Sequence, residues 1–151
     1  MKLAEALMER KAAKTKTEEL KKRIYQSSRI QEGDTAIENP LSLIEELKKE
    51  TARFENLIIR INRTNNAAKL SDEMTLMEAI VKKDMLNYLH LIHANLADKA
   101  TPAPDRYSQR EIKTVPNVDI GEIRKKADEI AKEYRMLDMK IQECNWKTEL
   151  I

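Results

Sequence analysis

Apolar side chains recur along this chain at alternating intervals of three and four residues. The most regular stretch follows Asn39 and Pro40 and comprises Ile44, Leu47, Thr51, Phe54, Ile58, Ile61 and Asn65. This alternation is the a/d pattern of helices that pack side by side. Similar patterns predict helices over about residues 3–26, 40–66, 75–100 and 119–146. We therefore expect an all-α protein, with four long amphipathic helices in an antiparallel bundle or in coiled-coil-like hairpins.

Capping residues support these helix starts. Asn39 can accept a hydrogen bond from a free backbone amide, and Pro40 suits the first helical position. Thr75 and Glu78 have the spacing of a capping box. Asp119 precedes the fourth helix in the same way. The starts of the second, third and fourth helices are therefore predicted by local chemistry as well as by periodicity.

The predicted third helix is apolar on two neighbouring stripes. One stripe comprises Val81, Met85, Tyr88 and Ile92, and the other comprises Leu86, Leu89, His93 and Leu96. The first helix has a single seam, of Leu3, Ala6, Arg10, Ala13, Thr17, Leu20 and Ile24, and so does the fourth, of Ile123, Ala127, Ile130, Tyr134, Leu137, Ile141 and Cys144. A helix that is apolar on two stripes must contact more than one partner. The third helix is therefore the candidate subunit interface, or the centre of the bundle.

A long loop is expected between the third and fourth helices. Residues 101–118 contain Pro102, Pro104 and Pro116. The alternation of Ile112 and Thr114 is too brief to decide whether the loop includes a short strand. Long ordered loops often carry function.

Composition limits the class of protein. Ala, Glu, Lys, Leu and Arg make up half of the 151 residues, as in long helices, and the length suits one domain over residues 1–151. Net charge is only +2, so no nucleic-acid partner is expected. The apolar runs are too short to span a membrane, and a single cysteine requires no oxidising compartment. A cytoplasmic location is the expectation.

Two histidines give a candidate metal site. His90 and His93 lie three residues apart, on one side of the predicted third helix. Imidazoles at this spacing, joined by an acid from another helix, could bind a divalent transition metal. Hydrogen-bonded core histidines are the alternative. No catalytic motif is present, and Cys144 is expected to be a small buried hydrophobic residue.

Polar side chains near the helix ends form a second candidate site. They are Asn62, Arg63, Asn65, Arg106, Tyr107, Arg135, Asp138, Gln142, Asn145 and Trp146. If the second and fourth helices run parallel to each other, these residues could gather at one end of the bundle. They could then bind a small anion, with arginine as a forked donor, or contact another subunit. Helix capping and interhelical hydrogen bonding are the alternative.

Several of these strings also resemble a known family. They are MKLAEAL at 1–7, RINRTN at 60–65, RYS at 106–108, EIK at 111–113, EYRMLD at 133–138 and IQECNW at 141–146. Together they look like the septicolysin-like family of bacterial proteins. The resemblance implies a helical, oligomer-forming bacterial protein of unassigned activity, and the family name suggests a membrane-active cytolysin.

These observations predict a self-assembling protein with a structural or interaction role, and no enzyme motif stands out. The expected partner is a second copy of the chain, in a dimer or a higher oligomer. A metal or small-ligand binding module at the subunit interface is the alternative, and a membrane-active cytolysin is the second alternative.

Overall fold

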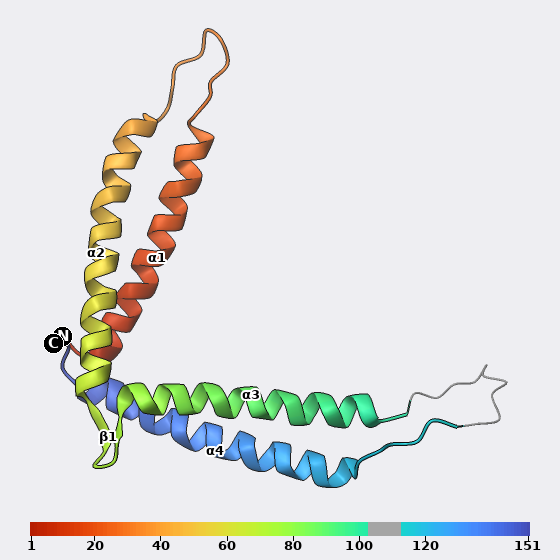
Figure 1. Cartoon of the computed structure of the whole chain (residues 1–151). Coiled ribbons are helices and arrows are strands. Elements are labelled where there is room, and N and C mark those ends of the chain that lie inside the picture. Colours follow the sequence, from red (N-terminus) through yellow and green to blue (C-terminus); the bar gives the residue numbers. More distant parts are fainter. Residues whose placement is uncertain (103–112) are drawn as a thin grey trace. The chain divides into compact units, whose positions relative to one another are not determined.

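The computed structural model describes residues 1–102 and 113–151 and confirms the all-α fold. Its helices are α1 (Leu3–Gln26), α2 (Pro40–Ala67), α3 (Leu76–Ala100) and α4 (Ile120–Lys147), as Figure 1 shows. Each helix end lies within one residue of its predicted position.

The predicted caps explain why these helices begin where they do. Asn39 Oδ1 accepts a hydrogen bond of 2.9 Å from the backbone amide two residues later. Glu78 Oε2 accepts one of 2.7 Å from the amide of Thr75, and the Thr75 hydroxyl accepts one of 3.2 Å in return. Asp119 Oδ1 accepts from the amide of Glu122 at 3.0 Å. These contacts satisfy amides that have no partner within the helix.

The chain divides into two compact units. Unit 1 comprises Met1–Lys69 and Glu143–Ile151, and unit 2 comprises Leu70–Gln142. Helix α4 begins in unit 2 and ends in unit 1. Because one continuous helix belongs to both units, we propose that residues 1–151 fold as the single domain expected from the sequence.

In unit 1, α1 and α2 pair as an antiparallel hairpin (Figure 1). The predicted α1 seam is confirmed, since Leu3, Ala6, Ala13 and Leu20 are buried. The predicted α2 seam is wrong at one of its two heptad positions. The buried residues are Leu43, Glu50, Leu57, Ile61 and Thr64, rather than the predicted series that includes Ile44, Thr51, Ile58 and Asn65. Because Glu50 is charged, the buried series is less apolar in sequence than the predicted series, which lies one residue further along the helix.

Residues from the two ends of the chain pair in unit 1. The Leu3 amide donates to the Thr148 carbonyl at 2.9 Å, and the Leu150 amide donates to the Met1 carbonyl at 2.9 Å. The Ile151 amide donates to Thr64 Oγ1 at 3.0 Å. These bonds hold the segment that follows α4 against α1 and α2.

In unit 2, α3 and α4 run antiparallel, connected by a series of polar contacts. Lys82 pairs with Glu133 at 3.1 Å and Lys83 with Asp138 at 3.0 Å. The predicted α4 seam is confirmed at Ala127, which is buried. A short hairpin of β1 (Lys69–Ser71) and β2 (Met74–Thr75) precedes α3. The sequence does not predict this hairpin, because strands of two or three residues are too short to show an alternating pattern.

The loop between α3 and α4 is only partly described. Residues 113–118 contain no strand, whereas Ile112 and the rest of 103–112 lie outside the described residues. In the parts that the structure describes, no helix is long and apolar enough to cross a membrane.

Candidate functional site

The most distinctive surface of the described residues lies on α3. It consists of eight large apolar side chains that are each 40–61% exposed: Met77, Val81, Met85, Tyr88, Leu89, Leu91, Ile92 and Leu96. We call this set the α3 apolar surface. It includes the whole of one stripe that the sequence predicted. Scattered exposed apolar residues are ordinary, but a contiguous set of this size marks an interaction site.

The opposite face of α3 packs against α4. Ala79, Leu86 and Ala97 are buried there, and His90 Nδ1 lies 3.1 Å from the Ala127 carbonyl. At 3.6 residues per turn, these positions project away from Tyr88 and Ile92. The first predicted stripe is exposed as a whole, whereas the second is divided: Leu86 is buried, but Leu89 and Leu96 belong to the α3 apolar surface. Only one face of α3 therefore has a partner among the described residues.

The centre of α3 is also free of charge. From Met85 to Ala97 there is no Asp, Glu, Lys or Arg, although these four residue types make up 36% of the chain. Exposed helix faces normally carry charged side chains that favour solvation. A stretch of thirteen residues without charge is instead typical of the core of an interface, where no charged group has to be removed from water.

Exposed apolar residues on α4 provide a contrast. Met136 and Met139 are 55% and 72% exposed. They stand beside Arg135 and Lys140, which are also exposed. Such isolated apolar side chains among charges need no partner.

The two histidines make different contacts. His90 Nδ1 faces the Ala127 carbonyl of α4, whereas His93 Nδ1 lies 2.7 Å from the carbonyl of Leu89 in its own helix. A carbonyl oxygen can only accept, so both rings donate through Nδ1. In the described part of the chain, no group of three or more His, Cys, Asp or Glu side chains could hold a metal ion. A metal at His90 and His93 stays a prediction.

The predicted polar end cluster is divided between the two units. Asn62, Arg63, Asn65, Asn145 and Trp146 belong to unit 1, and Arg135, Asp138 and Gln142 belong to unit 2. Arg106 and Tyr107 lie outside the described residues.

Within the cluster, the contacts that the structure describes are interhelical or within one helix. Asp138 accepts from Lys83 at 3.0 Å and from Gln142 at 3.5 Å. Asn145 is buried, whereas Arg63, Arg135 and Trp146 are exposed. These contacts match the structural alternative for Asp138 and Gln142, and a ligand site stays a prediction.

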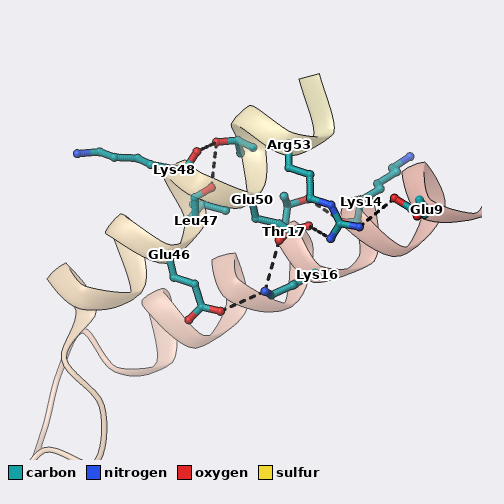
Figure 2. Close-up of polar contacts among 10 residues, drawn as sticks. Glu9, Lys14, Lys16, Thr17, Glu46, Leu47, Lys48, Glu50 and Arg53 are labelled. Atoms are coloured by element: carbon teal, nitrogen blue, oxygen red, sulfur yellow. Dashed lines mark hydrogen bonds and ion pairs between the residues drawn. The ribbon is translucent and has the colours of Figure 1, made fainter. Parts of the chain in front are cut away.

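A buried carboxylate that the sequence analysis did not single out lies between α1 and α2. Glu50 has a side chain that is only 8% exposed, and Figure 2 shows it between Lys16 and Arg53. Lys16 Nζ lies 3.4 Å from Glu50 Oε2 and 3.4 Å from Glu46 Oε1. The contact with Glu46, and then that with Glu50, raises the pKa of Lys16.

The ion pairs of Glu50 are long. Arg53 Nη1 lies 3.5 Å from Glu50 Oε1, and this oxygen has no hydrogen-bond partner among the described residues. Arg53 also pairs with Glu9 of α1 at 3.1 Å. The carboxylate is therefore held by cations at the edge of the α1–α2 interface rather than by close hydrogen bonds. We infer that it fixes the register in which α1 pairs with α2.

Comparisons with known proteins agree with this fold. No curated protein matches the chain. A crystal structure of a functionally unknown conserved protein from Corynebacterium diphtheriae has a TM-score of 0.94 and 46% sequence identity, over 100% of this chain and 99% of that one. Neither this structure nor the family match gives independent support to the septicolysin-like resemblance. Because residues 10–150 match the model of a family of unknown function (DUF6847), the chain belongs to that family.

Proposed function

We propose that this protein is a self-assembling structural or interaction protein, in which the α3 apolar surface is buried against a second copy of the chain. The observation that carries the proposal is the exposure of eight large apolar side chains on one helix whose opposite face is already packed. A dimer is the first expectation, and a larger ring is the second.

The size of the surface supports this proposal. Full burial of a large apolar side chain contributes about 1.5–3 kcal/mol, so covering the exposed half contributes roughly 1 kcal/mol. With eight side chains from each copy, the gross gain is on the order of 16 kcal/mol. Association costs roughly 4–15 kcal/mol in lost freedom of motion. The surface is therefore large enough to drive a stable contact.

The chemistry of the surface favours a second copy over a charged partner. The uncharged stretch of residues 85–97 can meet itself without burying an unpaired charge. Such a self-complementary patch is what a twofold-symmetric dimer requires. We place this assembly in a reducing, cytoplasmic setting, because a chain whose single cysteine is Cys144 requires no oxidising compartment.

The test is the mass in solution of the wild type and of a variant with Tyr88→Glu and Ile92→Glu. We expect at least twice the chain mass of 17.6 kDa for the wild type, by light scattering and sedimentation. The variant should be monomeric, with unchanged helical circular dichroism, because four carboxylates would then meet at the interface. A wild type that stays monomeric over a range of concentrations would overturn the proposal.

Met136→Glu with Met139→Glu is the matched control. It adds the same charge at exposed apolar positions of α4, outside the α3 apolar surface. We expect this variant to keep the wild-type mass. If the control dissociates as completely as the α3 variant, added charge in general is responsible and the assignment to α3 is wrong.

Lipid is the competing partner that the septicolysin-like resemblance suggests. An apolar helix face can also bind a membrane surface. Dye release from anionic lipid vesicles by a protein that is monomeric in solution would assign the α3 apolar surface to lipid and overturn self-assembly.

A further inference from the structure

We propose that two α3 helices pair antiparallel about a twofold axis near Ile92, with Asp84 of each copy opposite Lys99 of the other. This inference rests on the proposed self-assembly through the α3 apolar surface. It adds the direction of pairing and the residues that select it.

The charged residues of α3 divide into two groups. Four of them already have partners within the chain: Glu78 caps the helix, Lys82 pairs with Glu133, Lys83 pairs with Asp138, and Asp98 lies 3.6 Å from Arg124. The other two are Asp84 and Lys99, which are exposed and make no ion pair with the residues that the structure describes. Charges of opposite sign are therefore left over on one helix.

Asp84 and Lys99 lie on the same side of α3 as the apolar surface. Asp84 is four residues before Tyr88, and Lys99 is seven residues after Ile92. Each interval differs from a whole number of helical turns by less than half a residue. The two charges therefore stand at opposite ends of the uncharged stretch, on the face that is proposed to be covered.

Their spacing is nearly symmetric about Ile92. Asp84 precedes it by roughly 12 Å and Lys99 follows it by roughly 11 Å along the axis, at 1.5 Å per residue. A twofold axis perpendicular to α3 at Ile92 therefore brings Asp84 of one copy to nearly the same height along the helix pair as Lys99 of the other. Two identical ion pairs result, one at each end of the apolar contact.

A parallel arrangement reverses this result. It would place Asp84 against Asp84 and Lys99 against Lys99 of the second copy, so that both ends carry like charges. Exposed ion pairs add little to affinity, about 0.2–1 kcal/mol each. Like charges at the rim act against the wrong arrangement, so these residues select direction while the apolar side chains supply affinity.

The first test is a charge-reversal cycle measured at low salt by sedimentation equilibrium. Asp84→Lys and Lys99→Asp should each raise the Kd of self-association by roughly threefold to thirtyfold, because two attractive pairs become repulsive. The double variant with both changes should return to within about threefold of the wild type, since each introduced lysine then faces an introduced aspartate of the other copy. Lys132→Asp, an exposed change on α4 outside the surface, is the control and should leave the Kd unchanged.

The second test is disulfide formation in a Cys144→Ser background. Ile92→Cys should give a cross-linked dimer under mild oxidation, because it lies near the axis. Met85→Cys should not, because the two positions are separated by roughly 20 Å in the antiparallel pair. That separation is far beyond the reach of a disulfide.

The outcomes separate this inference from the proposed function. A monomeric wild type overturns self-assembly itself. A dimer that cross-links efficiently through Met85→Cys, or one that the double reversal does not restore, leaves self-assembly standing and overturns the antiparallel pairing.

Discussion

Glu50 shows how one residue can define the pairing of two helices. Its position in the heptad is shared with Leu43, Leu57 and Thr64, all of which are buried. The two cations that contact Glu50, Lys16 and Arg53, are both about half exposed. Removing a carboxylate from water costs more than partly exposed ion pairs return. The residue therefore favours one register at the expense of stability.

Replacing this carboxylate by an apolar side chain should stabilise the protein. For Glu50→Leu we expect the free energy of unfolding to rise by about 1–3 kcal/mol, because the volume is nearly kept and the desolvated charge is removed. Urea denaturation at neutral pH measures the change.

Glu46→Leu is the control for this substitution, since Glu46 also contacts Lys16 but its side chain is 46% exposed. Its effect should stay within about 0.5 kcal/mol. A lower unfolding midpoint for Glu50→Leu would mean that the ion pairs outweigh the desolvation of the carboxylate.

The seam of α2 also shows where residue-level prediction fails. Of the predicted seam, Ile61 is buried and Leu47 and Phe54 are half-buried, but the alternate positions are shifted by one residue. The pattern rule counts apolar side chains, and Glu50 is not one. Arg53 of α2 and Lys16 of the facing α1 make a carboxylate acceptable there, and a pattern within α2 does not contain Lys16.

At the scale of the element, helix starts were the most predictable feature. Asn39, Thr75 and Asp119 each accept the hydrogen bond that their sequence position predicts. Capping depends on residues within three or four positions of each other, so the sequence contains all of the information. The β1–β2 hairpin was missed because its pairing involves too few residues.

The cap of α3 should give the protein a defined pH dependence. The backbone hydrogen bond from Thr75, and then that from its hydroxyl, lower the pKa of Glu78 below its ordinary value of 4.5. A carboxyl whose pKa is lower in the folded state stabilises the fold above its ordinary pKa, and this contribution is lost as the pH falls through the lowered value. Glu78→Gln should therefore reduce the fall in melting temperature between about pH 5 and about pH 3.

Glu55→Gln is the comparison for that measurement, because Glu55 is exposed on α2 and makes no ion pair with the described residues. Its pH profile should follow the wild type more closely than that of Glu78→Gln. Identical profiles for Glu78→Gln and the wild type would show that the cap does not contribute to acid unfolding.

At the scale of the whole molecule, the second apolar face of α3 was predictable but its exposure was not. The double stripe indicates two partners, and α4 accounts for one of them. The division into two units was not predicted, because the four seams fit a single bundle as well as separate hairpins. The prediction of one polar end cluster assumed that the second and fourth helices bring their polar residues to the same end of a bundle. That depends on how the helices are placed, which the pattern along each helix does not contain.

The backbone pairing between residues 1–3 and 148–150 implies that this fold tolerates a change in chain order. A short linker from Ile151 to Met1 should bridge ends that are already hydrogen-bonded, and new ends can be opened at Gly33. Gly33 has a φ of 91° and open space around it, so no packing is lost there. Such a circular permutant should keep the wild-type helical circular dichroism and unfold cooperatively, whereas one opened beside the buried Leu57 should not fold.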